Sequence, residues 1–261
     1  MISTMNSNGI NRYIKRRKKL KKLKKIRILI SISLISIIGL TLFLSKISNM
    51  KVDNNTSISN RDARLVDDDV FTVVIDAGHG DWDVGTIGLN NSYEKDIVLP
   101  IALKLGELLE AQNINVVYTR TTDTLFWSDD SVENLYERVA ISNENNADLF
   151  ISIHCNSTDE SSSYNGVETW YNIDDKESNL LANLIQDELS ALEYTSDRGI
   201  KCYDKTEPLA VLERNNAPSA LIELGFISNA SDEAFLTSKN GQTLSAEAIY
   251  NAILTYKDTL N

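Results

Sequence analysis

The chain contains only two histidines, and each follows a short apolar run with the composition of a buried β-strand. His79 lies three residues beyond the run at residues 70–76, and His154 comes directly after the run at residues 149–153. In an open α/β sheet, the ligand crevice lies outside the carboxyl ends of the strands. We therefore expect both imidazoles to project toward the same edge of one sheet.

Two glutamates, Glu94 and Glu223, are candidates to join the histidines in one site. Glu223 lies within the apolar run 221–225, where a buried carboxylate is costly unless it is paired or bound to a metal. Glu94 opens a predicted helix after the segment 85–91, where the chain can fold back. Two histidines with one carboxylate ligand and a second carboxylate as base match a hydrolytic zinc site. The alternative is that each residue has a structural role and forms ordinary hydrogen bonds.

The elements expected around these residues alternate between strands and helices. Apolar runs predict strands at residues 70–76, 115–119, 149–153, 167–171, 209–212 and 220–224. Helical spacing predicts helices at residues 95–112, 131–143, 179–192 and 243–256. We expect the strand at 167–171 to lie at a sheet edge. This alternation predicts a single α/β domain with a central, mainly parallel sheet flanked by helices.

The N-terminal region has the composition of a membrane anchor. Residues 28–45 carry no charge over 18 positions, which is near the length that spans a bilayer. Eleven basic residues and no acidic ones precede them, so residues 1–27 should stay in the cytoplasm. Residues 46–69 then form a flexible linker, and residues 70–261 form a domain outside the cell membrane. The alternatives are a cleaved signal peptide, which would leave the protein secreted, and a buried helix.

The rest of the chain is strongly acidic. Subtracting the eleven N-terminal basic residues from the total of 26 leaves 15 against 37 acidic residues, a net charge of -22. Such a segment is a poor partner for nucleic acid or for an anionic membrane surface, because both repel it. Two cysteines, Cys155 and Cys202, are too few for a disulfide framework. They could form one bond outside the cell, or remain two independent thiols.

Four separated motifs together resemble the zinc-dependent N-acetylmuramoyl-L-alanine amidases. They are DAGHG at 76–80, YEKD at 93–96, SIHCN at 152–156 and IELGFISN at 222–229. The similarity includes residues 118–123, 137–140 and 198–201, and it covers about residues 70–256. The resemblance implies an enzyme that cleaves the amide between the lactyl group of N-acetylmuramic acid and L-alanine in peptidoglycan.

The resemblance also implies roles for the four residues singled out above. His79, Glu94 and His154 would hold one zinc ion, and Glu223 would be the catalytic carboxylate. The family fold, an α/β domain with a central sheet, agrees with the predicted elements. The motifs do not identify an activator protein.

The sequence departs from the family pattern at several positions. Asp81 and Trp82 follow His79-Gly80 where another glycine is usual, so the rim of the site is expected to differ. Cys155 stands where a less reactive residue is common. Some relatives carry a helical insert that blocks the cleft, but the stretch between Tyr171 and Asn179 is too short for one. We therefore expect no built-in plug of that kind.

Two other functions compete with the zinc enzyme. A thiol amidase would use Cys155 as nucleophile, but a side chain next to His154 tends to point to the opposite side of the strand. An inactive peptidoglycan-binding module would show a broken ligand set. Arg138 could bind a substrate carboxylate or pair with a structural acid. The tryptophans could line a sugar groove or simply pack, and they are Trp82, Trp127 and Trp170.

Overall fold

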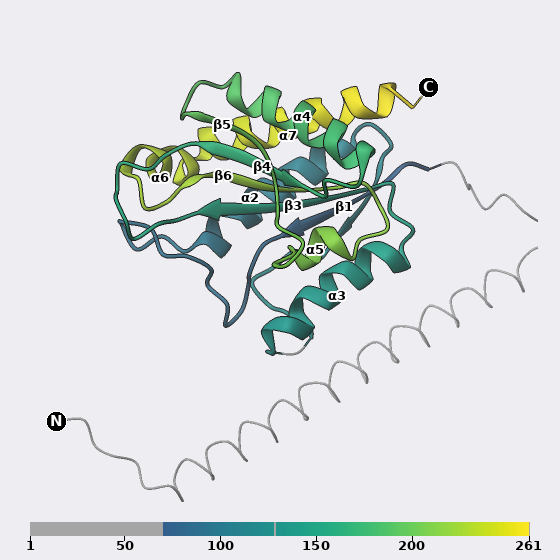
Figure 1. The fold of residues 1–261 in the computed structure, drawn as a ribbon, viewed down its shortest axis with the longest axis horizontal. Coiled ribbons are helices and arrows are strands. Elements are labelled where there is room, and N and C mark those ends of the chain that lie inside the picture. Colours follow the sequence, from purple (N-terminus) through teal and green to yellow (C-terminus); the bar gives the residue numbers. More distant parts are fainter. Residues whose placement is uncertain (1–69, 128, 261) are drawn as a thin grey trace, which may run out of the picture. The chain divides into compact units, whose positions relative to one another are not determined.

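A six-stranded sheet forms the centre of the structure, a computed structural model that describes residues 70–127 and 129–260 (Figure 1). Its spatial order is β2-β1-β3-β6-β4-β5, and only the β4–β6 pair is antiparallel among the five pairs of neighbouring strands. The prediction of a mainly parallel sheet is confirmed, although the antiparallel β4–β6 pair makes the sheet a mixed one. The strands are β1 (Thr72–Ala77), β2 (Asn115–Tyr118), β3 (Leu149–Asn156), β4 (Val167–Tyr171), β5 (Asp197–Cys202) and β6 (Ser219–Phe226).

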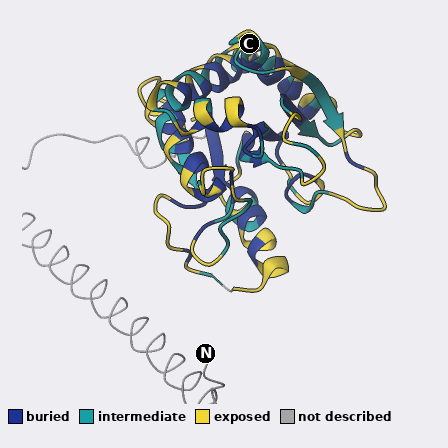
Figure 2. Cartoon of the chain, turned by 90° about the vertical axis from the view of Figure 1, so that its left-hand side faces the viewer, coloured by how far each residue is buried: buried dark blue, intermediate teal, exposed yellow. Residues whose placement is uncertain are grey.

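Helices cover both faces of the sheet (Figure 1). They are α2 (Glu94–Glu110), α3 (Ser131–Glu144), α4 (Lys176–Ser190), α5 (Ala210–Glu213), α6 (Ala230–Thr237) and α7 (Lys239–Asp258). Helices α2, α4 and α7 pack on one face over the larger apolar core, whereas α3 and α5 lie against the other face over a smaller core. Figure 2 shows the buried residues gathered along the sheet and the inner sides of the helices.

The period of two along each strand decides which side chains face the smaller core. In β1, Ile75 points into the larger core, while Val74 and Asp76 face α3. The same alternation in β3 places Ser152 and His154 on the α3 side. Polar side chains of the central strands therefore collect on the sheet face that α3 and α5 leave partly open.

Some predicted elements were wrong. Residues 209–212 were expected to be a strand, but Ala210–Glu213 forms the short helix α5. Strand β4 has the predicted bounds but is not at an edge, because β5 pairs with its outer side. Neither β5 nor α6 was predicted. Pro100 lies inside α2, which begins at Glu94 as expected.

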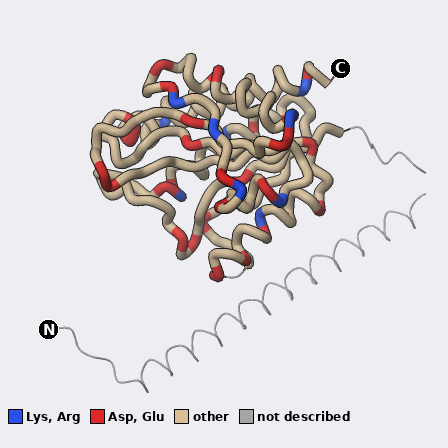
Figure 3. Tube along the Cα trace, viewed as in Figure 1, with Lys and Arg blue, Asp and Glu red and all other residues tan. Residues whose placement is uncertain are grey.

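The predictions for residues 1–69 lie outside the described residues, and these include the anchor at 28–45 and the linker at 46–69. Among residues 70–127 and 129–260, no helix combines the length and the hydropathy needed to cross a bilayer. Figure 3 shows acidic residues spread over the described domain, with fewer basic residues between them.

Candidate active site

The structure brings together the three residues predicted to hold a metal. The ligand atoms of His79, Glu94 and His154 all lie within 4.8 Å of one another. His79 Nε2 is 3.1 Å from Glu94 Oε2, and His154 Nδ1 is 2.9 Å from Glu94 Oε1. The fold explains the convergence: β1 and β3 are parallel neighbours, and α2 begins with Glu94 beside their carboxyl ends.

The turn after β1 holds His79 in an unusual conformation. Its φ is 60°, in the left-handed region that non-glycine residues seldom adopt and that often marks functional sites. Arg138 fixes this turn by donating hydrogen bonds to the carbonyl oxygens of Ala77 at 2.9 Å and His79 at 2.7 Å. Gly78 is required there, because a Cβ atom would lie 2.4 Å from Cε1 of the His154 ring.

Asp83 orients the His79 ring. Its Oδ2 lies 2.9 Å from His79 Nδ1, and its Oδ1 accepts the Gly85 N–H at 3.1 Å. Metal-binding histidines usually donate their second ring N–H to such a group. Burial disfavours the charged imidazole, but the hydrogen bonds to Asp83 and Glu94 outweigh burial and raise the pKa of His79 to about 9. Without a metal, His79 is therefore protonated at neutral pH.

Glu94 is a buried carboxylate whose position is fixed by the backbone. Its side chain is 4% exposed, and its two oxygens accept the N–H groups of Thr86 and Cys155, each at 2.9 Å. Burial alone would raise the pKa of Glu94, but the hydrogen bonds to His154 and His79 lower it well below the usual carboxyl range. Glu94 is thus ionised, as a metal ligand must be.

Glu223 lies beside this group on the neighbouring strand. Its Cα pairs in register with that of His154, so both side chains stand on the same face of the sheet. Its Oε2 is buried and has no hydrogen-bond partner among the described residues. Burial raises the pKa of Glu223 well above the usual carboxyl range, and the nearby carboxylates of Glu94 and Glu168 raise it further. A carboxylate with raised proton affinity suits general acid–base chemistry.

These donors fit a divalent metal ion. Two imidazole nitrogens and one carboxylate oxygen are the protein ligands typical of a catalytic metal that keeps a position open for water. Asp83 supplies the supporting hydrogen bond expected for one of the histidines. Asp83 was not among the residues predicted from the sequence, although it lies only four residues from His79.

A buried ion pair between Asp76 and Arg138 stabilises the site. Asp76 is 1% exposed and accepts hydrogen bonds from Arg138 Nη1 at 2.6 Å, Ser152 at 2.7 Å and Thr119 at 2.8 Å. Arg138 therefore pairs with a structural acid, which is one of the two roles that the sequence left open. Arg120 adds a hydrogen bond from Nη2 to the Gly78 carbonyl at 2.8 Å. Both arginines hold the loop that carries His79.

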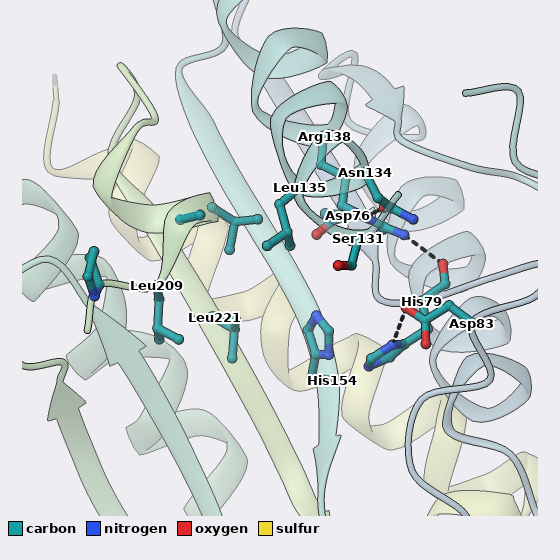
Figure 4. A pocket seen from close by; sticks show the side chains of 13 residues that line it. Asp76, His79, Asp83, Ser131, Asn134, Leu135, Arg138, His154, Leu209 and Leu221 are labelled. Atoms are coloured by element: carbon teal, nitrogen blue, oxygen red, sulfur yellow. Dashed lines mark hydrogen bonds and ion pairs between the residues drawn. The ribbon is translucent and has the colours of Figure 1, made fainter. Parts of the chain in front are cut away.

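Two cavities border the site, with volumes of about 350 and 460 Å³. The first lies between α3 and the two histidines; in Figure 4, Ser131 and Leu135 of α3 stand on one side, and His79 and His154 on the other. The second is lined by residues of the neighbouring strands, among them Glu223. The two cavities share Leu209 and Leu221, so they adjoin.

Glu168 continues the row of polar side chains across the sheet. Its Cα pairs in register with that of Glu223 on β6. It is 3% exposed, and it accepts hydrogen bonds from Arg198 Nε at 2.6 Å and from Asn156 Nδ2 and Trp170 Nε1, both at 3.1 Å. This buried carboxylate fixes two side chains that line the second cavity, Asn156 and Trp170, and also holds Arg198. Glu168 was not among the residues predicted from the sequence.

The turn at Asp81 explains why a glycine is usual there. Asp81 has a φ of 56°, in the left-handed region that aspartate tolerates better than most side chains. Its N–H donates to Asp123 Oδ1 at 3.0 Å, and its carbonyl accepts from Lys95 Nζ at 3.0 Å. The chain therefore forms this turn with aspartate, and an ion pair between Lys95 and Asp123 lies beside it.

The thiols and indoles have different surroundings. Cys155 packs into the larger core, on the opposite side of β3 from His154, and burial raises the pKa of its thiol well above the ordinary value. A nucleophilic thiolate at Cys155 is therefore disfavoured. Cys155 and Cys202 are both free, one buried and one exposed. Trp170 lines the second cavity, whereas Trp82 is 46% exposed.

Comparison with known proteins places the chain in a family. Residues 73–255 match the family described as N-acetylmuramoyl-L-alanine amidase. An uncharacterized Bacillus subtilis protein, YqiI, is 42% identical over 189 residues, which cover 72% of this chain and 85% of YqiI. The Bacillus subtilis N-acetylmuramoyl-L-alanine amidase LytC is 37% identical over 211 residues, covering 79% of this chain but only 40% of LytC.

Solved structures agree with these matches. The catalytic domain of the amidase CwlV from Bacillus (Paenibacillus) polymyxa is 34% identical with a TM-score of 0.65, covering 72% of this chain and 99% of that one. The CwlD amidase from Clostridioides difficile, solved in complex with the GerS lipoprotein, is 36% identical with a TM-score of 0.65 and the same coverage. This chain belongs to the N-acetylmuramoyl-L-alanine amidase family.

Proposed function

We propose that this protein hydrolyses the amide bond between N-acetylmuramic acid and L-alanine in peptidoglycan, with one zinc ion held by His79, Glu94 and His154. The observation that carries the proposal is the convergence of these three ligands beside the buried, unpartnered Oε2 of Glu223. Membership of the amidase family supports the substrate. The complete donor set argues against an inactive binding module.

An amide resists hydrolysis because its carbonyl is a poor electrophile and its amine a poor leaving group. Bound at this site, zinc would supply Lewis-acid polarisation of the scissile carbonyl and activation of a water molecule. Glu223 accepts the proton of the attacking water and returns it to the L-alanine nitrogen, which must be protonated to leave. Glu94, held ionised by its hydrogen bonds, offsets part of the charge of the metal centre.

The roles of the two glutamates can be tested separately. Glu94→Ala removes a ligand and should lower zinc content. Glu223→Gln preserves size and polarity but cannot accept a proton, so it should bind zinc near stoichiometry while amide cleavage falls by at least about 10². Thermal melting, zinc content and turnover are measured on the same preparations. Normal turnover by zinc-loaded Glu223→Gln would remove Glu223 from the mechanism.

We further propose that the enzyme acts outside the cytoplasmic membrane, anchored by residues 28–45. The support is the uncharged run of 18 residues behind eleven basic residues. The protein should remain with membranes after alkaline carbonate washing, and protease added to intact protoplasts should remove the catalytic domain. A mature protein beginning near residue 50 in the culture fluid would instead indicate cleavage and secretion.

A further inference from the structure

We infer that the substrate lies across the site in one direction, with its acyl half in the first cavity and its leaving peptide in the second. The first cavity is the one between α3 and the histidines, and the second is the one that contains Glu223. This inference rests on the proposed function and adds to it a peptide subsite and the direction of binding.

The order of the strands determines the direction in which the two cavities follow one another across the sheet. From β3 to β6 to β4, the row His154, Glu223, Glu168 crosses the sheet in register, with all three side chains on one face. His79 lies at the β3 end of this row, next to β1. In Figure 4, Leu209 and Leu221 lie on the side of His154 away from His79. The second cavity therefore begins where the first ends, on the Glu223 side.

The chemistry of amide cleavage then determines which half of the substrate lies in which cavity. The group that protonates the leaving nitrogen must reach it within hydrogen-bond distance. Glu223, to which we give this task, lines the second cavity and not the first. The nitrogen and the peptide attached to it must therefore leave through the second cavity. The lactyl group and its sugar remain on the side of α3, in the first cavity.

The lining of the second cavity combines apolar side chains with four carboxylates, those of Glu168, Asp204, Glu207 and Glu223. Its walls include the apolar side chains of Leu209 and Leu221 and the indole of Trp170. The indole is fixed by its hydrogen bond to Glu168, whose other oxygen is held by Arg198. Apolar walls combined with fixed polar groups are typical of ligand sites.

Two exposed residues allow a matched test in the full-length enzyme. Ser131 lines only the first cavity, and Cys202 lines only the second. Ser131→Phe and Cys202→Phe place the same bulky side chain into one cavity each, at surface positions where folding should be preserved. Thermal melting and zinc content verify that both variants are intact.

Each variant is assayed on two substrate series. The first series extends the peptide of N-acetylmuramoyl-L-alanine from one residue to three, and the second extends its glycan from one sugar to four. For the wild type, kcat/KM should rise along both series. Cys202→Phe should lose roughly tenfold or more of the gain from the longer peptide and keep the gain from the glycan, whereas Ser131→Phe should do the reverse.

The losses of kcat/KM on the two substrate series test the direction of binding. The opposite assignment of losses would reverse the direction of binding, and equal losses on both series, or no gain with peptide length in the wild type, would remove the peptide subsite. Each of these results presupposes amide cleavage by the wild type. Absence of cleavage by the zinc-loaded wild type would instead overturn the proposed function itself.

Discussion

Replacing Arg138 by methionine should destabilise the domain strongly. Arg138 is 3% exposed and donates to Asp76, to Asn134 Oδ1 at 2.8 Å and to the carbonyls of the loop that carries His79. Methionine can fill the space of the aliphatic stem but leaves Asp76 buried without its cation. Breaking a buried ion pair in this way costs about 3–5 kcal/mol. In a domain of this size, the melting temperature should fall by about 6–20 °C.

The electrostatic origin of the loss predicts its pH dependence. In the wild type, Arg138 holds the pKa of Asp76 below its ordinary value despite the burial that opposes ionisation. Without Arg138, burial raises the pKa of Asp76 in the folded state above its unfolded value. The variant is therefore least stable, relative to the wild type, at neutral pH, and the deficit shrinks as Asp76 becomes protonated at acid pH.

Calorimetry of both proteins between about pH 4 and 7 measures the deficit. Arg214→Met is the matched control, because Arg214 is exposed and its guanidinium lies over the Tyr136 ring, 4.7 Å from the centroid. Its cost should be about 1 kcal/mol or less. A deficit for Arg138→Met that is below about 1 kcal/mol, or that does not change with pH, would refute the buried pair as a support of the site.

Three further predictions concern the metal and the thiol. Asp83→Ala should weaken zinc binding by about 10–100-fold, because His79 loses the partner that orients it. Asp96→Ala, at an exposed position, is the control and should leave zinc binding unchanged. Competitive chelation measures the zinc affinity of both variants. Zinc affinity should rise with pH up to about 9, since binding must displace the proton of His79, whose metal-free pKa is about 9; a flat profile between about pH 6 and 8 would contradict this assignment. Cys155→Ala should retain amide cleavage, because the thiol faces the core; complete loss in a folded, zinc-loaded protein would revive the thiol mechanism.

The strands that the sequence predicted well are continuous apolar runs. Strands β1, β3 and β6 are buried on both faces of the sheet, and their parallel ends had to meet. Strand β5 was missed because its sequence DRGIKC is polar and only partly buried. The short run around α5 was taken for a strand, because four apolar residues carry no period that separates the two structures.

The residues of the site also divide into those that local sequence features predicted and those that depend on long-range packing. The positions of His79, His154 and Glu223 followed from strand ends and a carboxylate within an apolar run, and the structure brings all three together with Glu94. The partner of Arg138 did not follow, because Asp76 is 62 residues away in the chain and meets it only through the packing of α3 on the sheet. Glu168 was also missed, since its role depends on strand pairing.

The central claim is metal-dependent cleavage of the amide between N-acetylmuramic acid and L-alanine. Purified peptidoglycan is digested with the zinc-loaded full-length protein, and the new termini are identified by mass spectrometry, with and without complete chelation. We expect new free amino groups on L-alanine, which appear with zinc and are lost on chelation. New reducing sugar ends in place of L-alanine amines, or undiminished amine release after complete removal of the metal, would contradict it.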